Sequence, residues 1–180
     1  MTVIPLGSTE FEPFRLSPIG CASVGVGIGK TEAVIKSIAE LIGKSADISV
    51  VYAVPTHKLG VELVLRFAAR DVSSGVWRGR LADNPKDLNT KMCLKPDAIE
   101  KIISLGLPIQ QSMCRAKFEA HYISCDFFSL CPYQTQAGEL CDKQVVIVPH
   151  DSLFYEKPNI GPRNMLIIDE AFWPTGLRGL

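Results

Sequence analysis

Apolar residues in the first third of the chain change their spacing in a regular way. Over residues 31–45 they recur every three or four positions, which puts them on one face of an α-helix. Residues 48–54 then form a continuous β-branched run, typical of a strand buried on both faces. Helical spacing returns over residues 56–70. This alternation of strand and helix predicts an α/β domain with a parallel sheet.

The alternation stops after residue 70 and resumes at two further apolar runs, over 143–150 and 164–168, which predict strands. The stretch between is rich in turn-forming residues, and its clearest helical segment covers residues 96–106. We therefore expect two parts. Residues 1–75 and 143–180 would form the parallel-sheet domain, and residues 76–142 a small cysteine-rich, mostly helical insertion.

Composition and charge exclude several classes of protein. Apolar residues make up 47% of the 180 residues and charged residues 21%, which supports a packed core and argues against disorder. Lysine plus arginine equals aspartate plus glutamate, at 19 each, so a generally basic nucleic-acid binder is not expected, although a local basic groove is compatible. No apolar run reaches membrane-spanning length, and the N-terminal sequence has no secretion signal. We expect a cytoplasmic protein that does not enter a membrane.

The stretch VGVGIGKTEA, which begins at Val24, follows most of the phosphate-loop pattern G-x-x-x-x-G-K-[ST]. Gly29, Lys30 and Thr31 match its end, whereas Val24 stands where the first glycine is usual. Gly25 could supply the tight turn, because glycine adopts the angles that point N–H groups at phosphate oxygens. Lys30 would reach the β- and γ-phosphates of ATP, and Thr31 would bind magnesium. The alternative is a glycine-rich turn before an ordinary helix.

The last predicted strand ends in the two acids that such a loop requires. Asp169 would hold magnesium, and Glu170 would orient or deprotonate the attacking water. Acids that merely end a strand in solvent are the alternative. The candidate catalytic residues are Lys30, Asp169 and Glu170. The candidate ATP and magnesium ligands are Gly25, Gly27, Ile28, Gly29, Lys30, Thr31, Glu32 and Asp169.

Six cysteines are the second unusual feature of the sequence. Cys21 lies in the predicted strand before the loop, and the other five are Cys93, Cys114, Cys125, Cys131 and Cys141. Metal binding is a better interpretation than disulfides for a chain with a nucleotide motif and no secretion signal. The uneven spacing lacks the C-x2-C pairs of zinc ribbons and suits a cluster held by separate short elements. Buried free cysteines are the alternative.

The order of these motifs resembles the iron–sulfur superfamily 2 DNA helicases of the DinG and xeroderma-pigmentosum D type. In that family a four-cysteine insertion lies between two motifs. The first is a turn that comes after the phosphate loop and the next helix and strand, and the second is D-E-A-H. Here Pro-Thr-His at 55–57 matches the turn, Cys131 opens a C-P-Y stretch, and D-E-A-F at 169–172 replaces D-E-A-H. The chain is also similar to helicase-like proteins of bacteriophages and mobile elements. The likeness spans residues 20–173 as short motifs.

This resemblance implies a RecA-like P-loop domain, the first lobe of a helicase, that binds ATP and Mg²⁺. It implies contact with single-stranded DNA through Thr56 and His57, and Thr56 could also cap a helix. It further implies a 4Fe–4S cluster, whose ligands would be Cys93, Cys114, Cys125 and Cys131. Cys141 could take the place of Cys93, and zinc could take the place of the cluster.

Two features separate the chain from a complete helicase. Phe172 replaces the histidine that links ATP hydrolysis to the second lobe in the family. The sequence ends at residue 180, so a second lobe or a partner chain would have to supply the other wall of the ATP cleft. We expect ATP binding without DNA unwinding from this chain alone. The competing hypotheses are a metal-stabilised DNA- or protein-binding module with a relict nucleotide loop, and another P-loop ATPase of phage replication.

Some polar residues outside these motifs are expected to have ordinary structural roles. His121 and His150, like His57, show no metal-ligand spacing, so surface or capping positions are expected for them. Arg78 and Arg80 form a small basic patch that could touch DNA but is more typical of solvated surface.

Overall fold

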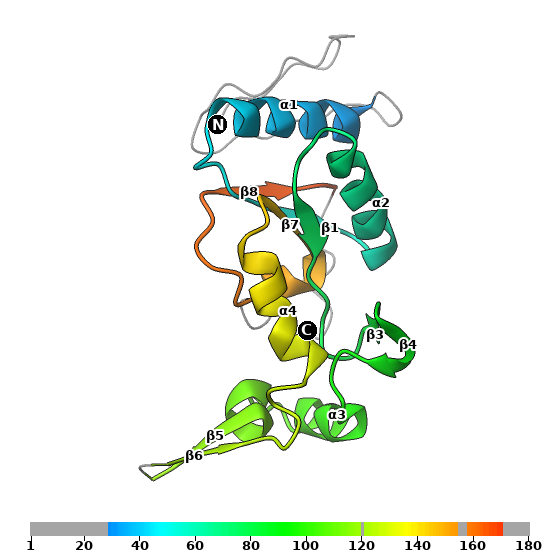
Figure 1. Ribbon diagram of the computed structural model, residues 1–180. Helices are drawn as coiled ribbons and strands as arrows, with labels where there is room; N and C mark the ends of the chain where they lie inside the picture. Colours follow the sequence, from blue (N-terminus) through cyan, green and yellow to red (C-terminus); the bar gives the residue numbers. More distant parts are fainter. Residues whose placement is uncertain (1–28, 120, 155–157, 171–180) are drawn as a thin grey trace.

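The structure is a computed structural model that describes residues 29–119, 121–154 and 158–170. Its centre is a four-stranded parallel sheet in the order β2–β7–β1–β8 (Figure 1). The strands are β1 (Val50–Val54), β2 (Ser74–Val76), β7 (Val145–Pro149) and β8 (Met165–Ile168). The predicted α/β class and parallel sheet are therefore confirmed. The strand expected before the phosphate loop lies outside the described residues.

The segments that follow the four parallel strands lie at one edge of the sheet. Val50 pairs with Val145 on one side and with Met165 on the other, and all three strands run in the same direction. Their carboxyl ends therefore lie together, which is the edge where parallel α/β sheets bind ligands. The residues that follow the four strands at this edge are Pro55–His57, Trp77–Arg78, His150–Asp151 and Asp169–Glu170.

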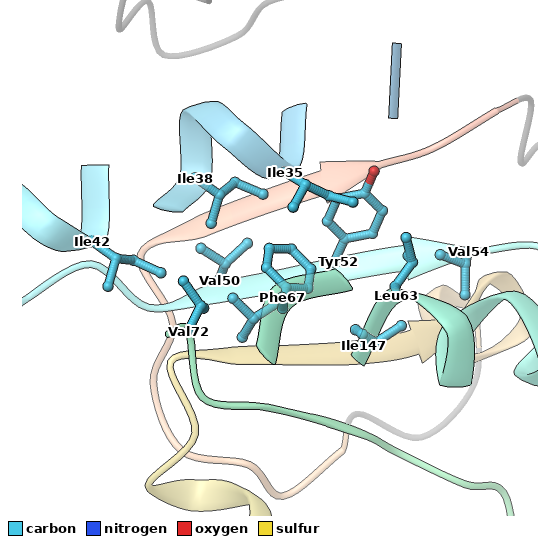
Figure 2. Packing of buried hydrophobic residues seen from close by; sticks show 11 residues of the cluster. Ile35, Ile38, Ile42, Val50, Tyr52, Val54, Leu63, Phe67, Val72 and Ile147 are labelled. Carbon is cyan, nitrogen blue, oxygen red and sulfur yellow. The ribbon is translucent and has the colours of Figure 1, made fainter. Parts of the chain in front are cut away.

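Two helices cover one face of the sheet, as the apolar spacing predicts. These are α1 (Lys30–Lys44) and α2 (His57–Ala68), which lie within the ranges 31–45 and 56–70 expected from the sequence to within one residue. Figure 2 shows their side chains packed on those of the strands. The buried residues of this core are Ile35, Ile38, Ile42, Val50, Tyr52, Val54, Leu63, Phe67, Val72, Val145 and Ile147. No helix in the described ranges is both long enough and apolar enough to span a bilayer.

The opposite face of the sheet carries a second core, to which α4 (Pro132–Cys141) contributes Tyr133 and Leu140. Its buried residues are Ala53, Trp77, Met92, Cys131, Tyr133, Leu140, Val146, Val148 and Ile160. Gly75 of β2 lies so close to α4 that an added Cβ would overlap the Leu140 side chain. Cys131 and Met92, both from the cysteine-bearing segment (residues 76–142), therefore share a core with the central strands.

The cysteine-bearing segment is mixed in structure, whereas a mostly helical one was expected. Besides α4 it contains α3 (Pro96–Ser104) and a π-helix (Gln110–Cys114). It also contains two antiparallel hairpins, β3 (Asp83–Asn84) with β4 (Asp87–Lys91), and β5 (Arg115–Phe118) with β6 (His121–Ser124). These strands are too short for a clear period of two, so helical spacing was the only strong signal that the segment offered.

Candidate nucleotide and metal sites

Asp169 is the centre of the first candidate site, at the carboxyl edge of the sheet. It follows β8 directly, and its Oδ2 accepts a hydrogen bond from Thr31 Oγ1 at 3.0 Å. The same oxygen accepts a hydrogen bond from the Tyr52 hydroxyl at 3.2 Å. The structure thus brings together the threonine and the acid that the sequence selected, although they lie far apart along the chain.

Tyr52 was not a candidate from the sequence, since it lies within the apolar run of β1. Its ring is buried and meets Phe67 edge to face, at 6.1 Å between ring centroids. Figure 2 shows the ring among the core residues and the hydroxyl oxygen directed out of them. Burial, followed by the negative charge of Asp169, raises the pKa of Tyr52 well above its ordinary value. The phenol therefore stays protonated and donates to the carboxylate. The sequence signal for this role was a polar aromatic residue within an otherwise aliphatic strand.

His150 is buried, which corrects the expectation of a surface or capping position. It follows β7 at the same edge of the sheet, and its Nε2 lies 2.8 Å from the backbone oxygen of Asp169. Because a carbonyl only accepts, Nε2 carries the proton and donates. His150 therefore fixes the backbone of Asp169, while Thr31 and Tyr52 fix its side chain. Its position immediately after a buried strand could have suggested this role.

The start of α1 is the part of the predicted phosphate loop that the structure describes. Gly29 precedes the helix with φ 78°, a left-handed conformation that glycine adopts without strain. Lys30 and Thr31 form the first helical positions, where the positive end of the helix dipole lies. The Glu32 carboxylate accepts hydrogen bonds from Arg66 of α2 and from Arg70, which lies just beyond the end of that helix. Any contact of Glu32 with a phosphate would therefore be through its backbone N–H. The other predicted loop residues, Gly25, Gly27 and Ile28, lie outside the described residues.

Glu170, the second predicted acid, is exposed and has φ 64°. A left-handed conformation is uncommon for a residue other than glycine, and such outliers concentrate at functional sites. Glu170 adjoins Asp169, so both acids lie at the carboxyl edge of the sheet.

Thr56 and His57 also lie at this edge, but their environments differ. Thr56 is exposed and caps α2, since its Oγ1 accepts a hydrogen bond from Leu59 N at 3.3 Å. His57 is partly buried, and its Nδ1 has no hydrogen-bond partner among the described residues. Burial, followed by the positive charge of Arg78, lowers the pKa of His57. His57 is thus neutral at pH 7, which weakens it as a contact for a phosphate.

Four cysteines of the cysteine-bearing segment line one pocket. They are Cys93, Cys114, Cys125 and Cys131, and they come from four different parts of the chain. The pocket is otherwise lined by Leu94, Lys95, Met113, Phe127, Phe128 and Gln134. Phe127 and Phe128 thus lie beside the cysteines. The β5–β6 hairpin joins two of the four, because Cys125 N donates to Cys114 O at 3.0 Å across its base.

The pocket contains two thiols in direct contact. A hydrogen bond from Cys93 lowers the pKa of Cys131 to about 6, and the same bond raises the pKa of Cys93. Burial raises the pKa of Cys114, and the nearby Arg80 opposes that shift. In the described part of the chain, no three His, Cys, Asp or Glu side chains converge tightly enough to coordinate one ion. The four thiols therefore share a pocket without forming a finished coordination shell.

Arg80 is buried beside this pocket, which corrects the expectation of solvated surface. Its guanidinium lies over the Tyr133 ring at 4.0 Å from the centroid and donates to Gln110 Oε1 at 2.9 Å. It also lies 4.0 Å from Cys114 Sγ, and its backbone oxygen accepts from Cys93 N at 2.8 Å. Arg80 therefore connects the segments that carry Cys93, Cys114 and Cys131. A single arginine gives no sequence signal for such a role.

Cys141 lies apart from the other four cysteines. It is exposed at the end of α4, and its Sγ donates to Gly138 O at 3.1 Å. Cys131 caps the other end of this 10-residue helix. A rise of about 1.5 Å per residue separates the two ends by about 15 Å. The structure thus groups Cys93, and not Cys141, with the other three. Cys21 lies outside the described residues.

Comparison with known proteins gives the chain no family. No model of a protein family, no curated protein and no solved structure matches it. The likeness to iron–sulfur helicases therefore rests on the motif residues alone.

Proposed function

We propose that the chain binds ATP and Mg²⁺ at the carboxyl edge of its sheet, as the RecA-like first lobe of an iron–sulfur DNA helicase or translocase. The hydrogen bond between Thr31 and Asp169 is the observation that carries the proposal. A hydroxyl and a carboxylate side by side are the oxygen ligands that Mg²⁺ prefers. The start of α1 adds the positive end of a helix dipole, which favours a phosphate.

Each residue of this edge has a distinct role in the proposal. Lys30 would neutralise the phosphates, while Thr31 and Asp169 would hold the metal ion. Glu170 would orient or deprotonate the attacking water. Magnesium would stabilise the charge that develops on the transferred phosphoryl group. Hydrolysis coupled to DNA would need a second lobe to complete the cleft, so we propose no unwinding by this chain alone.

The cysteine pocket supports the second half of the proposal, a 4Fe–4S cluster. Four thiols from separate segments line one pocket beside the buried cation Arg80. Thiolates are the donors that iron–sulfur clusters use, and a neighbouring positive charge stabilises them. The ligands would be Cys93, Cys114, Cys125 and Cys131. Zinc bound by the same thiolates is the alternative that metal analysis would separate.

The decisive experiment measures Mg²⁺-dependent binding of a fluorescent ATP analogue to the full chain. We expect Lys30→Ala to weaken binding about tenfold or more, because a charged contact to phosphate is lost. Lys36→Ala, on the exposed side of the same helix, should leave the affinity unchanged. Equal affinities for the two variants, or an intact chain that binds no nucleotide, would refute the ATP site. A chain that keeps its metal but binds no nucleotide would favour the alternative of a metal-stabilised binding module.

A further inference from the structure

The β5–β6 hairpin extends away from the body, at the end of the molecule remote from α1 (Figure 1). Its two strands pair in register, with Lys117 opposite Tyr122 and Phe118 opposite His121. Seven of its eight strand residues are exposed, and Ala116 is the partly buried exception. No sheet or helix therefore covers either face of this hairpin among the described residues.

One face of the hairpin combines cations with an aromatic ring. Directly opposed residues share a face, so Arg115, Lys117, Tyr122 and Ser124 lie together. The Arg115 guanidinium lies over the Tyr122 ring, 4.7 Å from its centroid. Tyr122 is 58% exposed, so its ring is available to a ligand. Cations beside an open ring suit a ligand with both phosphates and flat bases.

The second face is mainly apolar and also carries an aromatic ring. Phe118 is 64% exposed and Ile123 is 60% exposed, and His121 lies beside them. Glu119 follows at the tip of the hairpin and is the acid that partly offsets the two cations. A purely apolar surface would suit a protein partner. An exposed ring on each face, with cations beside one of them, suits single-stranded nucleic acid better.

We propose that the β5–β6 hairpin is a stacking element for single-stranded nucleic acid. Bases would stack on Tyr122 and Phe118, while Arg115 and Lys117 contact phosphates. The base of the hairpin is closed by the hydrogen bond between Cys125 N and Cys114 O, so the cysteine pocket would fix its direction. This inference takes from the proposed function only that the partner is a nucleic acid, and it does not require ATP binding.

The test is fluorescence anisotropy of a labelled oligo(dT) with the full chain. Tyr122→Ala and Phe118→Ala should each weaken binding about fivefold or more, since stacking contributes about 1–3 kcal/mol per base. Tyr122→Phe keeps a ring and should retain the affinity. Replacing both Arg115 and Lys117 by Gln should reduce the salt dependence, because two phosphate contacts disappear. Leu88→Ala, at an exposed apolar residue on β4, is the control.

Three outcomes would overturn the inference. The first is unchanged affinity in both alanine variants, with folding confirmed by circular dichroism. The second is an intact chain that binds no oligonucleotide, and the third is binding of anionic lipid vesicles in place of oligonucleotide. ATP binding is measured separately through Lys30→Ala, so failure of the hairpin and failure of the nucleotide site are distinguishable.

Discussion

Side chains near the carboxyl edge of the sheet have two roles. Some form hydrogen bonds to Asp169, and others join the helices through ion pairs. Thr31, Tyr52 and His150 hold the acid by its carboxylate or its carbonyl. Glu32 is a predicted nucleotide ligand, but its carboxylate forms ion pairs with Arg66 of α2 and with Arg70, just beyond the end of that helix. Its ion pairs join the first turn of α1 to the neighbouring helix.

The Glu32 ion pairs predict a pH-dependent stability. The hydrogen bond from Arg66 lowers the pKa of Glu32 below its ordinary 4.5, so the ionised carboxylate favours the folded state. This contribution is present above pH 4.5 and is lost as the pH falls through the lower folded-state value. Glu32→Gln should therefore lower the free energy of unfolding at pH 7, and the difference from the unmodified chain should shrink in acid. Urea unfolding from pH 7 to pH 3 measures this.

Glu40→Gln, on the exposed side of the same helix, is the control for Glu32→Gln. It removes an acid from α1 without removing the bonds to Arg66 and Arg70. A pH profile that Glu32→Gln and Glu40→Gln change equally would contradict a specific role for the Glu32 ion pairs.

At the level of elements, α4 is held at both ends by contacts from other segments. Its start lies at the cysteine pocket, because Cys131 is the N-cap. Its last carbonyls accept hydrogen bonds from Arg163, which reaches Leu140 O at 2.9 Å and Cys141 O at 3.0 Å. Arg163 also donates to Lys143 O, beyond the helix. A guanidinium suits this position because a helix C-terminus carries partial negative charge and unpaired carbonyls.

Arg163→Met should destabilise the chain by about 1–2 kcal/mol, because several carbonyls lose a charged donor and water replaces it only in part. Arg163→Lys should recover part of that loss, since an ammonium keeps the charge without the planar fork of donors. Chemical unfolding measures both. Lys58→Met, on the exposed side of α2, provides a control for the loss of a surface cation. Equal stability of Arg163→Met and the unmodified chain would contradict the capping role.

Across the whole molecule, the two candidate sites belong to different cores. The nucleotide edge is supported by the core under α1 and α2, and Tyr52 links that core to Asp169. The cysteine pocket adjoins the core under α4, which contains Cys131 together with Val146 and Val148 of the central strand β7. A metal bound to Cys131 would therefore stabilise the sheet as well as the cysteine-bearing segment.

Anaerobic purification should yield iron and sulfide bound to the chain, with the visible absorption of an iron–sulfur cluster. Cys131→Ser should reduce the bound metal and lower the thermal midpoint, because metal binding to the folded state stabilises it. Cys141→Ser should change neither, since Cys141 is exposed and outside the pocket. If the purified chain contains zinc and no iron, the proposed site is a zinc site and not an iron–sulfur cluster. Equal metal content in both variants would contradict the assignment of Cys131 as a ligand.

The amino-acid sequence by itself determined the elements whose signals are local. The periodic apolar residues of α1 and α2 and the continuous runs of β1, β7 and β8 gave these elements and the parallel sheet. The phosphate-loop and acid motifs also selected Thr31 and Asp169, because each motif is a short string with its own chemistry. These features can be recognised in the sequence because each is produced by residues that are close together along the chain.

Tertiary structure decided what depends on contacts between distant segments. It buried His150 and Arg80, aimed the Tyr52 hydroxyl at Asp169, and separated Cys141 from the other cysteines. The sheet order brings the ends of β1, β7 and β8 to one edge, and no local pattern contains that order. The physical reason is that spacing along the chain reports which face a residue occupies, whereas its partners depend on how the elements pack.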